Sequence, residues 1–473
     1  MKRSRVRYLT VACGVVLASL LPQIACSAAV SSGLVDDAGT VFSADGAVIE
    51  GDGATRPGDG GKINGDADAN AKDSALTDGA DLCSGVVCNA PPGPTCKDPA
   101  TLETFSASGT CSAGKCSYPS TQKTCACAAG ACGSFGAASS IATTNEHTCV
   151  LTSTGPKCWG NNGYGALGDG TKTSTRAPVD ASTLPGVVSI ATGYYQTCGL
   201  TAAGGVKCVG NGSVTATDVA GLTSGVVALS SGQAFNCAVT SAGAAKCWGL
   251  NTDGQLGNNT KQTSPTPVDV EGLTSGVVSI SAGYTSTCAL TQAGGVKCWG
   301  RNNSGQIGNP SVPFLGTPVP VDVQGLTSGV AAVSVGLNHA CALMTTGGVK
   351  CWGDMKITIT DHPVDIAGLS SGVAAISAGQ NNTCVLTSSG GVKCWGLNGS
   401  GQLGNNSSGT GSTSPVDVQG LTSGVASVAV GYNRACAVTT AGAAFCWGEN
   451  AKGELGNGGN QLSRVPVAVL GLP

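Results

Sequence analysis

Cysteine is the reactive side chain that recurs most regularly along this chain of 473 residues. The segment CALTQAGGVKCWG, from Cys288 to Gly300, is repeated seven times with small changes. Paired thiols at such a fixed short spacing form disulfides in an oxidising compartment, so their expected role is structural. The predicted pairs are Cys149–Cys158, Cys198–Cys208, Cys237–Cys247, Cys288–Cys298, Cys341–Cys351, Cys384–Cys394 and Cys436–Cys446.

Other groups that could perform catalysis are few. The three histidines, His147, His339 and His362, fall in different copies of the repeat, and no motif pairs one of them with a nucleophile. Aspartate boxes of the sialidase type and phosphate-binding glycine loops are absent from the sequence. A stretch around Asp66 resembles a calcium loop, but Ala71 stands where that loop needs glycine. We therefore expect no catalytic residue, no cofactor and no metal.

The repeated unit reads as strands throughout. In Val277 to Ala282 side chains alternate between two faces, and a hairpin follows around Gln292 to Gly294. Pairing Leu290 with Val296 places Cys288 opposite Cys298, and Trp299 on the other sheet face, between units. A period of about fifty residues with this content indicates stacked sheets. The predicted fold class is all-β, a propeller with one blade per copy.

The pattern of HT-C-AL, WGxNxxGQLG and a P-V strand resembles the regulator of chromosome condensation repeat, whose fold is a seven-bladed propeller. The resemblance covers about Ser134 to Pro473 and is clearest in WGLNTDGQLGNN, from Trp248 to Asn259. Two copies depart from it: the second has CVGNGSVTATDV, with Val209 in the tryptophan position, and the fifth has CWGDMKITITDHPV. Both lack GQLG. The expected domain spans residues 134–473.

Closure of the ring is predicted from the ends of this domain. The last segment, Pro466 to Pro473, repeats the P-V strand that we place before each other blade, and the first copy has no such strand before it. We therefore expect the last strand to pair into the first blade, which would remove two exposed edges.

The N-terminus resembles a secretory signal. Residues 1–25 have four basic residues followed by an apolar run from Leu9 to Leu21. Cys26 then occupies the position of a lipidated cysteine in a bacterial lipobox, and cleavage within Ser27 to Ala29 is the alternative. Residues 26–82 are rich in Gly, Asp, Ala and Ser, which indicates a flexible spacer. An exported protein is expected, at the bacterial cell envelope or secreted, with the membrane reached only through a lipid anchor.

Residues 83–133 form a predicted disulfide-rich module. Eight of the 24 cysteines lie between Cys83 and Cys132. A zinc site is the competing interpretation, but the module has no histidine and the secretory context favours disulfides. Eight cysteines allow 105 pairings, so the connectivity stays open.

The net charge argues against a polyanionic partner. It is −3 for the whole chain. Without the basic residues of the leader, 20 basic against 27 acidic residues leave −7. No nucleic-acid partner is therefore expected. Lysines recur at one strand position in six copies, and we expect their stems to pack on the blade with the ammonium groups in water.

The most variable positions are the three residues that follow the first strand of each copy. If the blades are equivalent, these turns share one face of the disc, and we place the GQLG loops on the opposite face. Aromatic anchors among Asn, Gln and Ser are typical of protein-recognition surfaces, whereas unconstrained turns would simply drift. The predicted partner-binding residues are His147, Tyr194, Tyr195, Gln196, Phe235, Tyr284, Asn338, His339, Asn382, Tyr432, Asn433 and Arg434.

The resemblance implies that this propeller works by docking a protein. Eukaryotic members of the family exchange nucleotide on a small GTPase, and a secreted bacterial relative inhibits β-lactamase. An exported chain meets no cytosolic GTPase, so our leading hypothesis is a surface-tethered, non-enzymatic binding protein. The alternative is a propeller that binds or cleaves carbohydrate. A glycan site needs carboxylates beside aromatic platforms, and the turns offer only Glu146.

Overall fold

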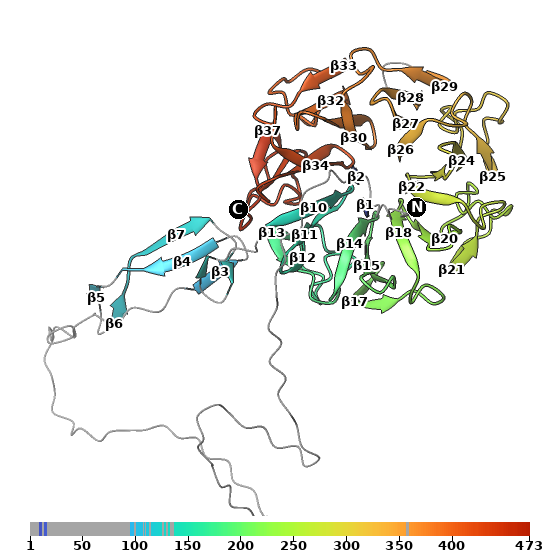
Figure 1. The fold of residues 1–473 in the computed structure, drawn as a ribbon. Coiled ribbons are helices and arrows are strands. Elements are labelled where there is room, and N and C mark those ends of the chain that lie inside the picture. The colour runs from blue at the N-terminus through green and yellow to red at the C-terminus, as the bar shows by residue number, and fades with distance from the viewer. Residues whose placement is uncertain are drawn as a thin grey trace, which may run out of the picture. The chain divides into compact units, whose positions relative to one another are not determined.

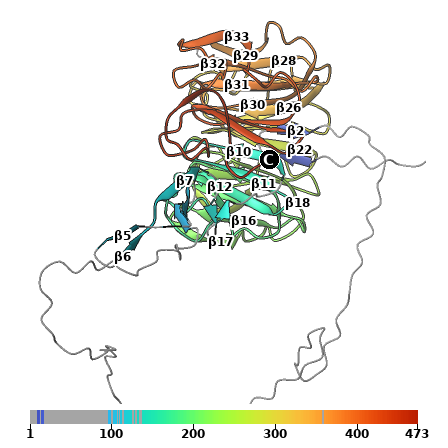
Figure 2. The ribbon, with the colours of Figure 1, turned by 90° about the vertical axis from the view of Figure 1, so that its left-hand side faces the viewer.

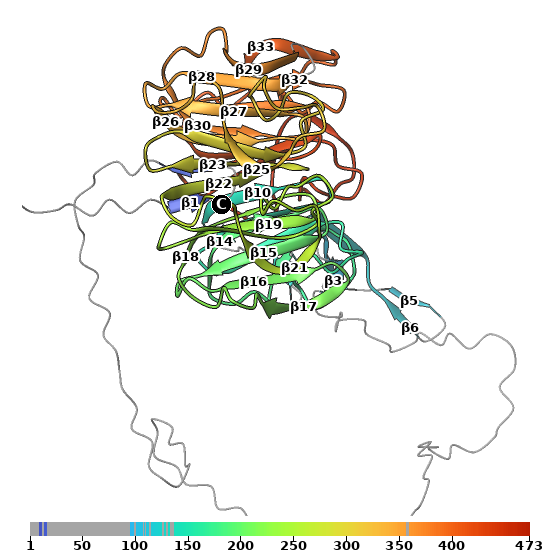
Figure 3. The ribbon, with the colours of Figure 1, turned by 90° about the vertical axis from the view of Figure 1, so that its right-hand side faces the viewer.

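A computed structural model describes residues 9–11, 14–16, 95–98, 101–106, 108, 110–112, 115–124, 127–128, 131–132, 137–355 and 359–473. Within these ranges every element of secondary structure is a β-strand. Seven four-stranded antiparallel sheets follow one another from Ala138 to Ala468 and form the ring seen in Figure 1. The predicted all-β, seven-bladed propeller is confirmed. The side views in Figures 2 and 3 show the sheets stacked one beside the next.

Each blade is a meander of four consecutive strands, with the first strand innermost and the fourth outermost. Their bounds are as follows: blade 1, β10 (Ala138–Thr143), β11 (His147–Thr152), β12 (Gly155–Gly160) and β13 (Thr175–Asp180); blade 2, β14 (Val187–Thr192), β15 (Gln196–Thr201), β16 (Val206–Gly210) and β17 (Ser213–Asp218); blade 3, β18 (Val226–Ser231), β19 (Phe235–Thr240), β20 (Ala245–Gly249) and β21 (Ser264–Asp269); blade 4, β22 (Val277–Ala282), β23 (Ser286–Thr291), β24 (Val296–Gly300) and β25 (Thr317–Asp322); blade 5, β26 (Val330–Val335), β27 (His339–Met344), β28 (Val349–Asp354) and β29 (Ile359–Asp365); blade 6, β30 (Val373–Ala378), β31 (Asn382–Thr387), β32 (Val392–Leu397) and β33 (Gly411–Asp417); blade 7, β34 (Val425–Val430), β35 (Arg434–Thr439), β36 (Ala444–Gly448) and β37 (Ser463–Ala468).

The cysteine pairs lie where the hairpin register was predicted to place them. In blade 4, Leu290 pairs with Val296 and Cys288 faces Cys298. The same disulfide forms between the second and third strands of all seven blades, and every one of these cysteines except Cys208 is completely buried or nearly so. The seven predicted disulfides are confirmed.

The tryptophans fill the gaps between blades. Trp299 is fully buried against Leu256 of the preceding blade, and its indole N–H donates to the carbonyl oxygen of Gln255 at 2.9 Å. Gly257 lies directly over the same ring, where a Cβ atom would overlap with the indole. The Gln-Leu-Gly part of the GQLG motif is therefore a plug that one blade inserts beside the tryptophan of the next.

A ring of glycines lines the central channel. Gly336 ends the first strand of blade 5, and a Cβ atom placed on it would overlap with the backbone oxygen of Gly379 in blade 6. The glycines at the equivalent positions of blades 2, 3, 4, 6 and 7 also approach a carbonyl of the following blade. The first strands of neighbouring blades can therefore approach so closely around the channel only because these residues have no side chain.

The prediction for ring closure is wrong. The strand β37 pairs with β36 within blade 7, and β10 begins a complete blade of its own. The P-V segment is thus the outermost strand of the blade it ends. The ring closes through side-chain packing of blade 7 on blade 1, where Ala429, Val438 and Leu455 cluster with Ile141 and Trp159.

We had expected the ammonium groups of the recurrent lysines to lie in water, but each of them forms an ion pair. Lys297 Nζ lies 2.6 Å from Asp322 Oδ1 on the neighbouring strand, and equivalent pairs form in the other five blades with this lysine. Blade 7 has Phe445 opposite Ala468 at these positions. Each lysine charge therefore meets a carboxylate across the sheet.

N-terminal to the propeller the structure describes only short strands. The sheet β3 (Thr95–Asp98), β4 (Thr101–Phe105) and β7 (Ser120–Thr124) lies in the predicted cysteine-rich module, with the pairs β5 (Thr110–Ser112)–β6 (Lys115–Ser117) and β8 (Cys127–Ala128)–β9 (Ala131–Cys132). Cys111 and Cys116 are both disulfide-bonded. Nearer the start of the chain, β1 (Leu9–Val11) pairs with β2 (Gly14–Val16).

The remaining N-terminal predictions concern residues that the structure does not describe. The lipidation site at Cys26 and the spacer of residues 26–82 lie outside the described ranges, as does most of the predicted signal. Among the described residues there is no helix long and apolar enough to cross a membrane.

Candidate functional site

The seven variable turns and the long loops after the third strands lie on one face of the propeller, which we call the turn face. His147 at the start of β11 pairs with Gly160 at the end of β12, so both strands have that end on the same face. The backbone N–H of Asn161 then donates to the carbonyl of Glu146 at 2.8 Å. Our placement of the GQLG loops on the opposite face is wrong, because turn and loop flank the same end of one hairpin.

Five tyrosines form a continuous cluster on the turn face. Tyr195 lies with its ring centroid 4.0 Å from Tyr164 and 4.3 Å from Tyr194. The contacts continue from Tyr194 to Tyr284 at 6.5 Å and from Tyr284 to Tyr432 at 6.1 Å. The two longer separations are ordinary for favourable aromatic pairs, and the two shorter ones place the rings in close contact. The tyrosine cluster thus joins residues of blades 1, 2, 4 and 7 and contains five of the seven tyrosines in the chain.

Three phenol groups of the cluster, those of Tyr194, Tyr195 and Tyr284, have a raised pKa. Burial, with the neighbouring Tyr194 and Tyr164, raises the pKa of Tyr195 to about 12. Burial also raises the pKa of Tyr284 and of Tyr194. The buried hydroxyl of Tyr284 has no hydrogen-bond partner within the described residues. The cluster therefore offers ring faces and O–H groups for binding, and the raised pKa values of Tyr194, Tyr195 and Tyr284 disfavour these three phenols as bases at neutral pH.

The mouth of the central channel opens beside this cluster. Its lining includes Tyr194, Tyr284 and Tyr432 together with the glycine ring, and the cavity measures about 70 Å³. A site for a drug-sized molecule typically measures several hundred Å³. The channel mouth can hold a few waters, so a macromolecule that binds here must rest on the turn face.

Six of the predicted partner-binding residues are buried and do not reach the surface. They begin the second strand of their blades, and each is at most 6% exposed: His147, Gln196, Phe235, His339, Asn382 and Arg434. We had assigned them to the turns. In a strand they share a face with the cysteine two positions later, which is also buried. They cannot contact a docked partner directly.

These buried residues connect neighbouring blades. His147 Nε2 lies 2.7 Å from Thr197 Oγ1 of blade 2, and His339 Nε2 lies 2.8 Å from Thr383 Oγ1 of blade 6. Burial, with the charge of Arg434, lowers the pKa of His147 to about 3, so this imidazole is neutral near pH 7 and a poor proton acceptor. The HT of the HT-C motif is thus a contact between the histidine of one blade and the threonine of the next.

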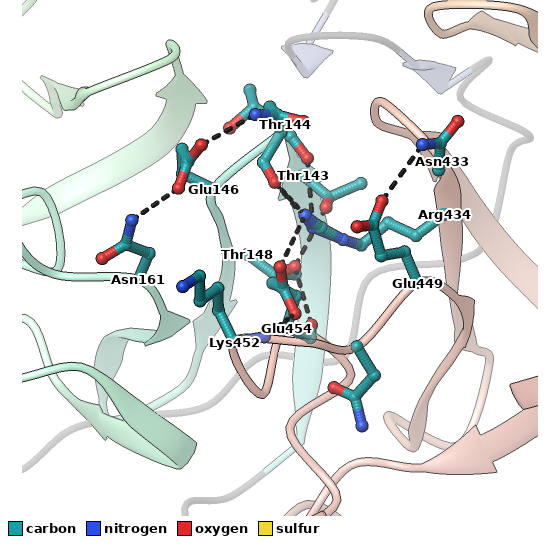
Figure 4. A network of polar contacts seen from close by, with 12 residues as sticks. Thr143, Thr144, Glu146, Thr148, Asn161, Asn433, Arg434, Glu449, Lys452 and Glu454 are labelled. Atoms are coloured by element: carbon teal, nitrogen blue, oxygen red, sulfur yellow. Dashed lines mark hydrogen bonds and ion pairs between the residues drawn. The ribbon is translucent and has the colours of Figure 1, made fainter. Parts of the chain in front are cut away.

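The junction of blades 7 and 1 has a charged version of this contact (Figure 4). Arg434 donates to the carbonyl oxygens of Thr144 and Asn145, and its Nη2 lies 3.6 Å from Glu454 Oε1. Both side chains are buried. The carbonyl of Glu454 also accepts hydrogen bonds from Thr148 and from the indole of Trp159. Arg434 thus braces the ring where its two ends meet.

The other predicted residues, Asn338 and Asn433, are half-buried in the turns of blades 5 and 7. Asn433 Nδ2 donates to Glu449 Oε2 at 3.1 Å. Glu146 accepts hydrogen bonds from the side chains of Asn145 and Asn161 and lies beside the tyrosines. The described residues hold no group of three or more possible metal ligands.

Sequence reasoning missed Tyr164. This residue belongs to the GALG loop of blade 1, is 46% exposed and contacts Tyr195 from outside the turn. Because we placed the loops on the opposite face, its position next to the turns was overlooked. The shared register of His147 and Gly160 was the signal that could have found it.

Two family models match the propeller. Both carry the description regulator of chromosome condensation (RCC1) repeat; one matches residues 158–200, 246–290 and 389–438, and the other 226–255, 277–306, 330–356, 373–402 and 425–454. The propeller is built of RCC1 repeats. The matches reach every blade, so the resemblance predicted from the sequence is confirmed.

Known proteins with similar RCC1 repeats align with only part of this chain. The ultraviolet-B receptor UVR8 of Arabidopsis thaliana is 31% identical over 109 residues, which is 22% of this chain and 24% of the receptor. The E3 ubiquitin-protein ligase HERC2 of Homo sapiens is 30% identical over 231 residues, or 48% of this chain and 4% of the ligase. The alignments thus span a quarter or less of these relatives.

Solved structures support the fold. Yeast RCC1 (Prp20), in a crystal structure with Kap60, aligns with a TM-score of 0.60 and 20% identity over 66% of this chain and 83% of its own. Human WBSCR16 aligns with a TM-score of 0.58 and 22% identity over 66% of this chain and 93% of its own. At these identities the likeness is one of fold.

Proposed function

We propose that this chain is an exported, non-enzymatic binding protein that docks a protein partner on the turn face of its RCC1-type propeller. The observation that carries the proposal is the tyrosine cluster. Five of the seven tyrosines lie together on one face, in turns and a loop that otherwise differ between blades.

The composition of this face suits a protein partner. Tyrosine supplies a large, rigid contact area with a polar tip, and interfaces concentrate their binding energy in a few such residues. Around the cluster the turns offer amides such as those of Gln233, Asn338 and Asn433. Backbone hydrogen bonds from Tyr194 to Gln233 and from Tyr284 to Gly336 tie the turns of different blades together. The surface is therefore already organised before a partner arrives, which lowers the entropic cost of binding.

The disulfides support the assignment to an oxidising compartment. Seven buried disulfides, one in each blade, form and persist outside the reducing cytosol. Together with the apolar N-terminal leader they favour export, and Cys26 is the proposed point of lipid attachment. Yeast RCC1 crystallised with Kap60, so a propeller of this fold is known with a protein partner.

A comparative pull-down tests the proposal. The chain would be immobilised and incubated with solubilised envelope proteins of its source organism, and retained proteins would be quantified. We expect Tyr195→Ala and Tyr432→Ala each to reduce retention of the specific partner about tenfold, which is the effect of losing an aromatic anchor. Val278→Ala is the matched control, because Val278 is 42% exposed at the start of a first strand, on the opposite face.

Two results would contradict the proposal. One is retention that no turn-face substitution changes. The other is binding to a glycan array that Tyr195→Ala abolishes in the absence of any protein partner, which would favour a carbohydrate-binding propeller.

A further inference from the structure

Blade 2 lacks the buried apolar residue that each of the other blades inserts beside its neighbour. Its strands β16 and β17 are joined by Asn211 and Gly212 alone, both with positive φ, as a tight two-residue hairpin turn requires. In blade 1 the corresponding connection spans residues 161–174 and carries Leu167. The segment that would cover the outer part of blade 3 is therefore missing.

The other six junctions show what normally fills this position. An apolar residue that follows the third strand is buried in the same cluster as the residue in the tryptophan position of the next blade. These pairs are Leu167 with Val209, Leu256 with Trp299, Ile307 with Trp352, Met355 with Trp395, Leu403 with Trp447 and Leu455 with Trp159. The cluster around Trp248, between blades 2 and 3, contains no such residue.

The vacant position is an open groove of about 400 Å³. Trp248 lines it together with Gln196, Asn211, Asn236 and Pro265, and its size is that of a small-ligand site. Trp248 is also the most exposed of the six tryptophans, at 6%. Four other tryptophans donate their indole N–H to a carbonyl of the preceding blade, but the described residues show no such acceptor for Trp248.

We propose that the groove between blades 2 and 3 binds a loop of a partner protein with the sequence character Gln-Leu-Gly, in which the groove takes up the leucine and Trp248 donates to the preceding carbonyl. The chain displays Gln-Leu-Gly, or a close variant of it, at five of its six other junctions. At the next one, Gln255 supplies the carbonyl, Leu256 the buried side chain and Gly257 the residue that fits over the indole.

The charge of the groove agrees with an uncharged loop. Its one acidic lining residue, Asp218, is already paired with Lys207 at 2.6 Å. The amides of Gln196, Asn236 and Asn211 are linked in a chain of hydrogen bonds that shapes one wall. The observations behind this proposal do not involve the tyrosine cluster. The proposal therefore holds even if no partner binds the tyrosine cluster.

A peptide from this chain provides the probe. A peptide with the sequence of residues 251–260 contains Gln255, Leu256 and Gly257, and it includes both partners of the loop's hydrogen bonds from Leu256 N to Asn251 Oδ1 and from Asn251 Nδ2 to the Thr260 carbonyl. It would be titrated into the purified full chain carrying ¹⁵N-labelled tryptophan. We expect a saturable shift of the Trp248 indole N–H signal, identified by its loss in Trp248→Phe. A matched peptide with Leu256→Asp should bind at least about tenfold more weakly, because it cannot bury the leucine.

Two variants of the protein complete the test. Trp248→Phe keeps an aromatic ring but not the N–H donor. Since it has no Trp248 signal, its peptide affinity would be measured by titration calorimetry, and it should be about fivefold weaker or more. In the second, the turn of Asn211 and Gly212 is replaced by the loop of residues 250–263, which fills the groove in cis and should abolish binding. The remaining indole signals report whether each variant is folded.

Several results would overturn the proposal. They are an unshifted Trp248 signal at millimolar peptide, equal affinity for the two peptides, and undiminished binding by the loop-grafted variant. A shift of Trp248 with soluble oligosaccharides but not with the peptide would also overturn it, in favour of a glycan.

Discussion

Arg434 Nη2 lies 3.6 Å from Glu454 Oε1, and both residues are buried where the last blade meets the first. At the junctions after blades 3, 4 and 6, the position of Glu454 is held by Gln255, Gln306 and Gln402. The position of Arg434 is held by histidine in blades 1 and 5 and by Gln, Phe, Ser or Asn in the others. The junction of blade 7 with blade 1 is the one at which the two blades are not consecutive in the sequence. It is also the one that has an opposite-charge pair.

Removing one member of this pair should destabilise the ring. Glu454→Gln gives blade 7 the GQLG sequence of blades 3 and 6 but removes the carboxylate that interacts most strongly with the buried Arg434, and we expect a loss of about 3 kcal/mol. The double variant Glu454→Gln with Arg434→His should recover most of that loss, because it reproduces the neutral contact of the other blades. Urea unfolding of the four proteins gives the coupling energy directly, and a stable Glu454→Gln single variant would contradict the argument.

The glycine ring should tolerate no side chain. In Gly336→Ala the new Cβ would overlap with the carbonyl of Gly379, and backbone cannot move aside as a flexible side chain can. We expect a loss of about 2 kcal/mol or more. Gly399→Ala is the matched control: Gly399 is exposed and a Cβ there meets nothing within 4 Å. Melting temperatures compare the two, and equal values would refute the packing argument.

His147 should make stability depend on pH. Its pKa falls from 6.5 to about 3 on folding, so between these values the unfolded chain binds more protons than the folded one. The contribution is fully present above pH 6.5 and is lost on acidification, by up to about 1.4 kcal/mol per pH unit. His147→Gln replaces the imidazole with the group that blade 2 uses at the same position. Unfolding free energies of both proteins from pH 7 to 4 should converge as the pH falls, and parallel curves would contradict the assignment.

The blade disulfides should each contribute moderately. Cys288 and Cys298 are separated by 10 residues, a short loop for which chain entropy predicts about 2–3 kcal/mol. The double variant Cys288→Ala with Cys298→Ala should lose that amount or less, since the hairpin is also held by its ladder. Peptide mapping without reductant should recover each of the seven cysteine pairs as one linked species. Links between blades would refute the pairing.

The repeat made the blades predictable from sequence. Seven copies of one segment revealed the period, and the register of Leu290 with Val296 followed from a three-residue turn. The disulfides between facing cysteines could then be predicted without knowing how the blades pack together. It was harder to predict which strand begins each blade and which strand ends it. The P-V strand pairs with the strand before it, and a sequence cannot show which of two adjacent blades an edge strand joins.

The candidate site was predictable in part. Tyr194, Tyr195, Tyr284 and Tyr432 were found because they vary where their surroundings do not. Phe235 and Arg434 were misplaced because composition was weighed above alternation. Each lies two residues before a buried cysteine and so shares its face. The contact of His147 with Thr197 joins residues 50 positions apart, and only the stacking of blades brings them together.

Every blade is made of contiguous residues, so no sheet combines strands from the two ends of the propeller. Cutting the ring at another linker and joining Pro473 to the residue before Ala138 would yield the same seven sheets in the same order. Gene rearrangement can therefore copy, delete or permute whole blades without breaking a sheet. Only the partners across a junction must be matched again. At the present ends these are Arg434 with the carbonyls of Thr144 and Asn145, and the Glu454 carbonyl with Thr148 and Trp159.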